Sequence, residues 1–338
     1  MPTFCRHNRF IERCPICSKA LPGQSPAGSP SRASAPTRTR TGGSPAQRSR
    51  RAVHAEGVRV RREGRAQDDG YRCELVPGLR ASADAARLAE EIALSAGRLL
   101  ALAADPPGLY GEIRALARSD LERATWWCLL LVYLSPLEGA DPFAGIRRAL
   151  TASPAQLPDL DGIPLGARTC HDPARGQQTL IAYRQWVARG GRAGAVDADT
   201  AAAGSQALAF VGDPGWDARR RFERLFERLS LPGLTRAGRY ELLLELGRLG
   251  CYELAPDALH FAGADDQATQ AAKRVFGIGD AMLLERRAAA LAQALAAPLE
   301  ALDLALYNWV AAEPARLGFP PETRDEAVLH SARAALGL

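Results

Sequence analysis

Apolar residues recur along much of the chain at the three- and four-residue intervals of amphipathic helices. The clearest case lies within 216–229, where Phe222, Leu225, Phe226 and Leu229 fall at i, i+3, i+4 and i+7. These positions share one face of an α-helix, and a protein core must cover such a face. Similar patterns predict helices over residues 83–103, 120–134, 177–188, 239–249, 267–275, 282–296 and 298–309.

Proline and glycine indicate where several of these helices end. Asp105-Pro106-Pro107-Gly108 follows the first helix, and Pro232-Gly233 follows the helix within 216–229. Gly250 comes directly after 239–249, where a glycine is typical of a helix C-terminus. Residues 120–134 are apolar on nearly every face, so we expect this helix at the centre of the core.

Three segments lack this helical period. Residues 151–175 and 190–204 are rich in loop-forming residues and are predicted to be irregular. Valine and arginine alternate from residue 58, and Asp68-Asp69-Gly70 is a turn signal, so a short β-hairpin is predicted over 58–76.

Composition supports an all-α protein. Hydrophobic residues make up 47% of the 338 residues and charged residues 24%, as in ordinary globular proteins, and aromatic residues only 6%. Alanine and leucine are abundant, and both favour helix over sheet. The longest apolar run, 126–134, is too short to cross a membrane.

Positive charge is concentrated near the N-terminus. The whole chain carries a net charge of +5, whereas Lys19–Arg65 contains eleven Lys or Arg and two acids, about +9 (11 − 2). Two interpretations stay open: this segment neutralises nucleic-acid phosphates, or it is an ordinary solvated linker.

The sequence divides into four predicted regions. Residues 1–18 form a small cysteine- and histidine-bearing module, and 19–57 form a basic linker rich in Pro, Gly and Ser that is predicted to be disordered. Residues 58–312 form the helical domain, and 313–338 form a C-terminal helical extension. The N-terminus lacks the apolar core of a signal peptide, and the odd number of cysteines, seven, argues against a disulfide framework, so we expect a cytoplasmic location near the nucleoid.

The first eighteen residues carry a candidate zinc site, Cys5-x-His7-x6-Cys14-Pro15-Ile16-Cys17. The two thiolates of a Cys-x-x-Cys knuckle converge on one ion, and two further ligands complete a tetrahedral zinc site. Cys5 and His7 supply them if the chain bends between them, or Cys73 replaces one. A closed site with four protein ligands is structural, and the alternative is a redox pair or spare thiols.

A candidate phosphate-binding turn lies between two predicted helices at Gly277-Ile278-Gly279. Glycines leave backbone N–H groups accessible at the start of the second helix, and a DNA phosphate can bind there. Lys273 and Arg274 stand just before the turn and add positive charge. The alternative is a plain helix–helix connection.

Asp303 is the candidate catalytic residue because it lies on the apolar face formed by Leu299, Leu302, Leu306 and Val310. A carboxylate within such a face is costly unless it is paired or used in chemistry. Beside a deoxyribose it would stabilise a cationic centre or orient a nucleophile. The alternative is a buried helix cap.

Other polar residues carry weaker hypotheses. Tyr307 and Asn308 lie about one turn after Asp303 and are candidates to line the same pocket. Cys170-His171-Asp172 is interpreted as loop composition, because adjacent side chains rarely point at one substrate. Arginines at 219–221, 236 and 239 are candidates for phosphate contacts or for pairing with Glu223, Glu227 and Glu241.

Several motifs together resemble the alpha-glutamyl/putrescinyl thymine pyrophosphorylase family, clade 3, over about residues 58–312. They are Asp68-Asp69-Gly70-Tyr71, Leu75-Val76-Pro77-Gly78-Leu79, Arg239-Tyr240-Glu241-Leu242-Leu243, Leu246-Gly247-Arg248-Leu249-Gly250, Phe276-Gly277-Ile278-Gly279-Asp280, Glu285-Arg286-Arg287-Ala288 and Leu302-Asp303-Leu304-Ala305-Leu306-Tyr307-Asn308-Trp309. That family is similar to helix-hairpin-helix DNA glycosylases, in which a hairpin holds the DNA backbone and a carboxylate faces the flipped nucleotide.

The resemblance implies DNA as the partner and a modified pyrimidine as the target. The implied reaction replaces pyrophosphate on a 5-hydroxymethyluracil derivative with an amine, such as glutamate or putrescine, while excision of the base is the glycosylase-like alternative. Asp303 would be the catalytic carboxylate. Glycosylases with lyase activity typically place a lysine four residues past the hairpin, where this chain has Leu283, so a Schiff base is not expected. A non-catalytic DNA-binding or damage-sensing zinc protein is the other functional class, and an adaptor for protein partners a weaker third.

Overall fold

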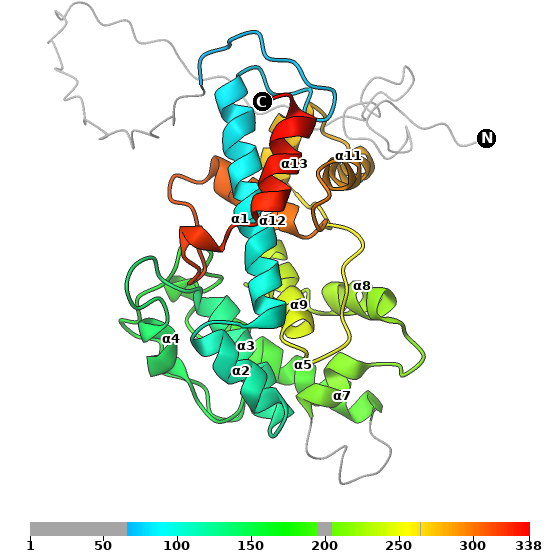
Figure 1. Ribbon diagram of the computed structural model, residues 1–338. Helices are drawn as coiled ribbons and strands as arrows, with labels where there is room; N and C mark the ends of the chain where they lie inside the picture. Colours follow the sequence, from blue (N-terminus) through cyan, green and yellow to red (C-terminus); the bar gives the residue numbers. More distant parts are fainter. Residues whose placement is uncertain (1–65, 195–204, 264) are drawn as a thin grey trace, which may run out of the picture. The chain divides into compact units, whose positions relative to one another are not determined.

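The computed structural model describes residues 66–194, 205–263 and 265–338, with side chains 191–194 excepted (Figure 1). These residues belong to one compact unit that runs from Arg61 to Leu338. Every regular element in the described ranges is helical, as expected for an all-α protein. The α-helices are α1 (Ser82–Ala104), α2 (Leu109–Ala117), α3 (Leu121–Leu134), α4 (Ala144–Ala149), α5 (Gln178–Gly194), α7 (Gln206–Val211), α8 (Ala218–Arg228), α9 (Arg236–Arg248), α10 (Gln267–Phe276), α11 (Ala281–Ala294), α12 (Ala301–Val310) and α13 (Glu326–Leu336), and two 3-10 turns are η3 (Pro173–Arg175) and η4 (Pro321–Thr323).

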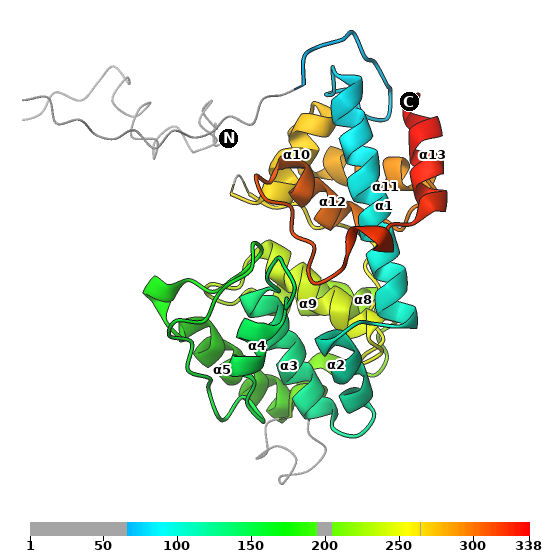
Figure 2. The same ribbon diagram turned by 60° about the vertical axis from the view of Figure 1, so that its left-hand side comes forward.

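The helices form two groups, and the long helix α1 runs through both (Figures 1 and 2). Helices α10 to α13 gather around the N-terminal part of α1, where α12 and α13 pack directly on it. Helices α2 to α9 gather at its other end, where α3 contacts α2, α4, α7 and α9. Since α1 also contacts α9, it joins the two groups of helices.

The core extends through both groups of helices because each buries its apolar face against a neighbour. Helix α3 is buried on nearly all sides, as its sequence predicts, and its Trp126 is fully buried. Trp126 stacks on Tyr183 of α5 with ring centroids 6.0 Å apart. Burial of such large side chains supplies much of the stability of a helical protein.

Side-chain caps set the start of most helices that surround the site. Asp120, Thr235, Asp266 and Asp280 each accept a hydrogen bond from a backbone N–H in the first turn of the helix that follows. Such caps satisfy N–H groups that have no partner within the helix. The cap at Thr235 explains why α9 begins three residues before the helix predicted from its apolar period.

The helices predicted from apolar periodicity are all present, with ends shifted by a few residues. Three short helices, α2, α4 and α7, were not predicted, and α5 continues to Gly194 where the sequence predicted a loop from residue 190. The C-terminal extension contains α13, which is held to α1 by a hydrogen bond of 2.9 Å from Asp325 N to the Ala93 carbonyl.

The predicted β-hairpin over 58–76 is wrong for its described part. Residues 66–80 contain turns and no strand. The Asp69 carboxylate accepts hydrogen bonds from the backbone N–H groups of Tyr71 and Ser82, at 3.0 Å each. Side-chain bonds of this kind fold the segment back on itself and replace strand pairing.

No helix within the described ranges is both long and apolar enough to cross a membrane.

Candidate functional site

Asp303 lies at the centre of a buried ion-pair cluster. It stands in the first turn of α12 and is 1% exposed. Its Oδ2 accepts a hydrogen bond of 2.8 Å from Arg168 Nη2, and its Oδ1 one of 2.5 Å from Arg236 Nη2. Both carboxylate oxygens are therefore engaged by guanidinium groups, one from the loop before α5 and one from the start of α9.

The cluster continues away from Asp303 in both directions. Arg168 Nη1 bonds to Glu241 Oε2 at 2.9 Å, and Glu241 is also paired with Arg98 of α1. Arg98 in turn bonds to Glu245 at 2.9 Å. On the other side, Arg236 Nε bonds to Asp266 Oδ1 at 2.9 Å. The chain of charges thus connects α1, α9, α12, the start of α10 and the loop that carries Arg168.

Charge within this cluster is nearly balanced. Burial alone would raise the pKa of Asp303, but the charges of Arg236 and Arg168 outweigh it and lower the pKa, so the carboxylate is ionised. Burial, and then the nearby Glu241, raise the pKa of Glu245 well above its usual range. Four carboxyl groups, from Glu241, Glu245, Asp266 and Asp303, thus face the three arginines Arg98, Arg168 and Arg236.

The position of Arg168 follows from the way its loop attaches to the end of α3. Gly166 approaches so closely that a Cβ there would lie 2.0 Å from the Pro136 carbonyl oxygen. Three residues on, Thr169 Oγ1 donates to the Tyr133 carbonyl at 2.9 Å, and Cys170 N donates to the same carbonyl at 2.9 Å. These contacts fix the backbone on both sides of Arg168.

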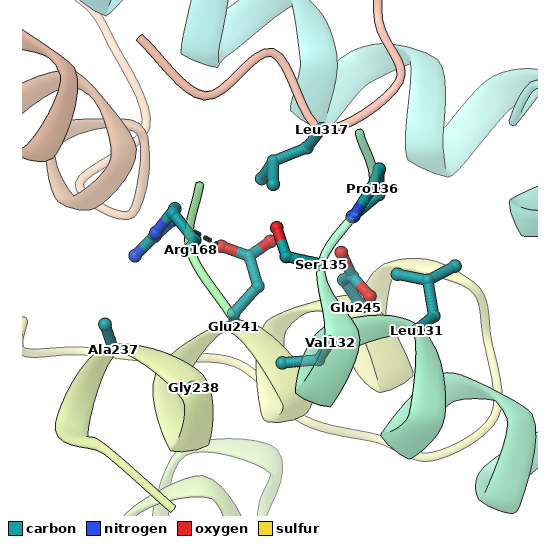
Figure 3. Close-up of a pocket in the computed structure, with 10 residues that line it drawn as sticks. All are labelled: Leu131, Val132, Ser135, Pro136, Arg168, Ala237, Gly238, Glu241, Glu245 and Leu317. Atoms are coloured by element: carbon teal, nitrogen blue, oxygen red, sulfur yellow. Dashed lines mark hydrogen bonds and ion pairs between the residues drawn. The ribbon is translucent and has the colours of Figure 1, made fainter. Parts of the chain in front are cut away.

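Beneath Arg168 lies a small cavity, shown in Figure 3. It measures about 10 Å³, room for roughly one water molecule. Glu241 and Glu245 line it from α9, and Ser135 lines it from the end of α3. The Ser135 Oγ is buried and lacks a hydrogen-bond partner among the described residues.

On its other side Arg168 lines a much larger cleft of about 510 Å³. This volume lies within the range of small-molecule pockets, roughly 300–1,000 Å³. Residues from both groups of helices surround it, namely Ala167, Arg168, Thr169, Thr235, Arg236, Ala237, Arg239, Ala262, Gly263, Asp265, Asp266, Gln267 and Tyr307. Asp303 itself does not line the cleft; its two arginine partners do.

The residues predicted to share a pocket with Asp303 separate in the structure. Tyr307 lines the cleft, donates to the Ala167 carbonyl at 2.8 Å and lies under the Arg168 guanidinium, 4.8 Å from the ring centroid. Asn308 is fully buried and does not line the cleft. Its amide bonds to Glu91 at 3.0 Å and to both backbone groups of Ala315, which makes it a structural residue.

The glycine turn forms an exposed connection between α10 and α11. Gly277 ends α10 in the left-handed conformation with φ of 66°, and Asp280 caps α11. Gly277 and Gly279 are exposed, and a Cβ on Gly279 would meet no atom within 4 Å. Lys273 and Arg274 lie in the last turn of α10. The arrangement is a helix, a short turn and a second helix whose N-terminus faces solvent.

Next to this turn, two large apolar side chains are exposed. Met282 is 69% exposed and Leu283, at the position where lyase-type glycosylases carry a lysine, is 46% exposed. An amine for a Schiff base is therefore absent at this position.

Helix α10 connects the turn to the cleft. Its first residue, Gln267, and its cap, Asp266, line the cleft, and its last residue stands next to Gly277. Ten helical residues span about 15 Å, which corresponds to about four base-pair steps along one DNA strand. The exposed turn and the cleft thus lie at the two ends of one helix, about 15 Å apart.

The Cys170-His171-Asp172 triplet does not form a catalytic group, as the sequence interpretation expected. Cys170 Sγ lies 3.2 Å from Thr235 Oγ1, and His171 Nδ1 lies 3.0 Å from Tyr133 Oη. Asp172 caps the turn η3 instead. Each side chain thus serves a different local contact.

The predicted zinc ligands Cys5, His7, Cys14 and Cys17 lie outside the described residues. Within the described ranges no group of three or more potential ligands could hold a metal ion, and Cys73, the alternative ligand, has a free thiol half-buried near the Ala335 carbonyl. Zinc binding stays a prediction.

Comparison of the chain with protein-family models, with curated proteins and with solved structures found no match.

Of the two arginines that pair with Asp303, Arg168 is the one that the sequence did not indicate. It stands in the irregular segment 151–175 and 135 positions before Asp303, so no periodicity relates the two. The only signal was Asp303 itself, because a carboxylate within an apolar helix face requires a buried cation. Arg236 and Arg239 were considered for phosphate contacts, and both line the cleft.

Proposed function

We propose that this protein is an enzyme that binds DNA through the turn between α10 and α11 and modifies or excises a modified pyrimidine in the adjacent cleft. The observation that carries the proposal is the placement of both features on one helix, with the exposed glycine turn at one end of α10 and the 510 Å³ cleft at the other. Enzymes that act on a base in duplex DNA extrude the nucleotide into such a pocket.

Within this proposal Asp303 acts through its two arginines. Arg168 and Arg236 line the cleft, while the carboxylate behind them holds their guanidinium groups in place. Fixed donors of this kind stabilise negative charge that develops in a transition state. Direct contact between Asp303 and the sugar or base would require one guanidinium group to leave its carboxylate oxygen.

The reaction has two forms, and each makes a different product. Replacement of pyrophosphate by an amine leaves the glycosidic bond intact and adds the amine to the exocyclic carbon. Excision releases the free base and leaves an abasic site in the strand. The first form requires an amine donor, for which glutamate and putrescine are the candidates that the family resemblance implies.

Mass spectrometry tests the proposal directly. DNA containing 5-hydroxymethyluracil or its pyrophosphorylated derivative is incubated with the protein, with and without glutamate or putrescine, and its nucleosides are analysed. We expect either an amine adduct or loss of the modified base. Unchanged nucleosides with every substrate, from protein that binds the same DNA, would contradict an enzymatic function.

A non-catalytic DNA-binding protein is the second candidate, and one observation favours it. Both oxygens of Asp303 are occupied and the residue is sealed from solvent, as in a purely structural ion pair. Such a protein would bind DNA through the same turn and leave every nucleoside unchanged.

A further inference from the structure

We propose that the cleft contains a binding site for a phosphoryl group, formed by Arg239 and the first backbone N–H groups of α9. The inference rests on the proposed use of this cleft by a nucleotide, and it assigns a position to the nucleotide's phosphate. Three observations support this site. They concern Arg239, the first turn of α9 and the acidic residues that line the cleft.

Arg239 is a half-buried cation with no carboxylate partner among the described residues. Its Nη1 donates to the Phe226 carbonyl at 2.9 Å, and its guanidinium lies on the Phe226 ring, 4.4 Å from the centroid. Its Nε is buried and has no hydrogen-bond partner in the described part of the chain. Burial, and then the nearby Arg236, lower the pKa of Arg239, so an anion beside it would relieve an uncompensated charge.

The first turn of α9 supplies further donors to the same cleft. Thr235 caps this 13-residue helix by accepting from Gly238 N at 3.0 Å, while the N–H groups of Arg236 and Ala237 have no acceptor within the described ranges. Residues 235–237 and Arg239 all line the cleft. Free N–H groups at a helix start, together with a guanidinium, suit the several oxygens of a phosphoryl group.

The acidic residues of the cleft leave this site open to an anion. Asp266 is already bound to Arg236 and to the N–H and hydroxyl of Thr269. Asp265 is exposed, so solvent screens its charge, whereas Arg239 is half-buried. Solvent therefore screens the positive charge of Arg239, which has no carboxylate partner among the described residues, less than the negative charge of Asp265.

Titration calorimetry at low ionic strength tests the site with inorganic phosphate and with thymidine 5′-monophosphate. We expect saturable binding of one equivalent and at least a tenfold loss of affinity in Arg239→Gln. Arg220→Gln is the matched control, since Arg220 is exposed on α8 outside the cleft, and it should bind as the wild type does. Absence of saturable binding in the wild type, or equal affinity in Arg239→Gln, would overturn the proposal.

A second measurement uses the unaltered protein and so does not depend on the folding of a variant. Phenylglyoxal modifies accessible arginines, and peptide mass spectrometry reports each site. Phosphate should protect Arg239 and leave Arg220 reactive; equal modification of Arg239 with and without phosphate counts against the site.

A third experiment identifies the source of the phosphoryl group. A single-stranded oligonucleotide that displaces the monophosphate assigns the site to a backbone phosphate, and failure to displace it assigns the site to a free nucleotide or to a phosphoryl group on the base. Either result supports the site. The binding of phosphate is measured without turnover, so the phosphate site is still supported if the protein alters no DNA base. Conversely, failure to bind phosphate would not argue against DNA binding at the glycine turn.

Discussion

Asp303 is the residue whose replacement best separates the possible roles of the site. Asp303→Asn keeps the shape of the side chain but leaves Arg168 and Arg236 without the charge between them. Breaking a buried ion pair costs about 3–5 kcal/mol, and losing a fixed electrostatic contact lowers turnover by about two orders of magnitude or more. Urea denaturation and the nucleoside assay measure the two effects. Asp265→Asn, at the exposed carboxylate of the same cleft, should change the free energy of unfolding by less than about 0.5 kcal/mol.

Arg168→Gln distinguishes a positioning role of Asp303 from direct catalysis. This variant removes one guanidinium from the cleft while Asp303 keeps Arg236. If Asp303 acts through its arginines, Arg168→Gln loses turnover as Asp303→Asn does. Full turnover in Arg168→Gln with none in Asp303→Asn would instead assign the chemistry to the carboxylate, and a stable Asp303→Asn with full turnover would exclude Asp303 from the reaction.

The ionised state of Asp303 also predicts how stability depends on pH. Its pKa in the folded protein is lower than the ordinary value of 3.8, so its contribution is fully present above that value. The contribution is lost as the pH falls through the lower, folded value. Melting temperatures measured between pH 6 and pH 2 should therefore fall more steeply in the wild type than in Asp303→Asn. Parallel curves would show that the ion pairs contribute no net stability.

At the scale of elements, the turn between α10 and α11 allows its function to be tested without disturbing the fold. A Cβ on Gly279 would meet nothing, so Gly279→Ala should fold normally but hinder the approach of a DNA phosphate. We expect weaker DNA binding, measured by fluorescence anisotropy, with little change in its salt dependence. Unaltered affinity would mean that the turn has only a structural role.

Gly277 needs a control for backbone strain. Its φ of 66° costs an alanine about 1–2 kcal/mol, so Gly277→Ala loses stability as well as DNA affinity. Gly250, which follows α9, has a similar φ of 74°; a Cβ there would meet no atom within 4 Å, whereas one on Gly277 would lie in ordinary contact with Gly78, 3.5 Å from its Cα. Gly250→Ala should therefore lose similar stability and keep its DNA affinity.

The helices were predictable to the extent that each carries a repeated apolar face. Helix α8 carries Phe222, Leu225 and Phe226 in one register that continues to its C-cap Leu229, and α3 is apolar on nearly every face, so both were evident from the sequence. Helices α4 and α7 have six residues each, too few for a period to repeat. The segment before α1 has the alternation and the turn signal of a β-hairpin, but its Asp69 carboxylate binds nearby backbone N–H groups, so its described part forms turns.

The site was predictable only in part. Asp303 was evident from its place in an apolar face, and Tyr307 from its spacing to Asp303. The cleft depends on the loop that bears Arg168 and on the start of α9, which only the tertiary structure brings together. Asn308 shared the spacing of Tyr307 but faces Glu91 and Ala315, because adjacent helical residues point about 100° apart.

At the scale of the whole molecule, the compact unit that starts at Arg61 predicts that the fragment 61–338 folds alone. Its DNA binding should show a shallower salt dependence than that of the full chain, since most of the eleven cations of Lys19–Arg65 are removed and each phosphate contact contributes about 0.9 to the slope. Anisotropy titrations between 50 and 200 mM salt, roughly the range where this effect is large, give both slopes. Equal salt dependences for the full chain and the fragment would show that Lys19–Arg65 acts only as a spacer.

The N-terminal module is expected to bind one zinc ion through Cys5, Cys14, Cys17 and His7. Elemental analysis of the purified chain should give about one equivalent, lost in the double variant Cys14→Ser/Cys17→Ser. The fragment 61–338 is the control and should contain none. A full-length chain purified without any metal would contradict the zinc site.

The contact between Gly78 and α10 determines where the N-terminal region is attached. Gly78 N donates to the Val275 carbonyl at 2.9 Å, and a Cβ on Gly78 would lie 1.9 Å from the Arg274 carbonyl oxygen, so the chain enters the helical unit directly beside the glycine turn. The linker that the sequence predicts over 19–57 has 39 residues (57 − 19 + 1), and a flexible chain of that length spans roughly 35 Å. If DNA binds at the turn and the N-terminal module binds the same DNA, a linker of this length would give the module an effective concentration in the millimolar range around it. Two weak contacts with one DNA strand would then combine into a higher overall affinity. The protein could move to the next target base without dissociating from the DNA.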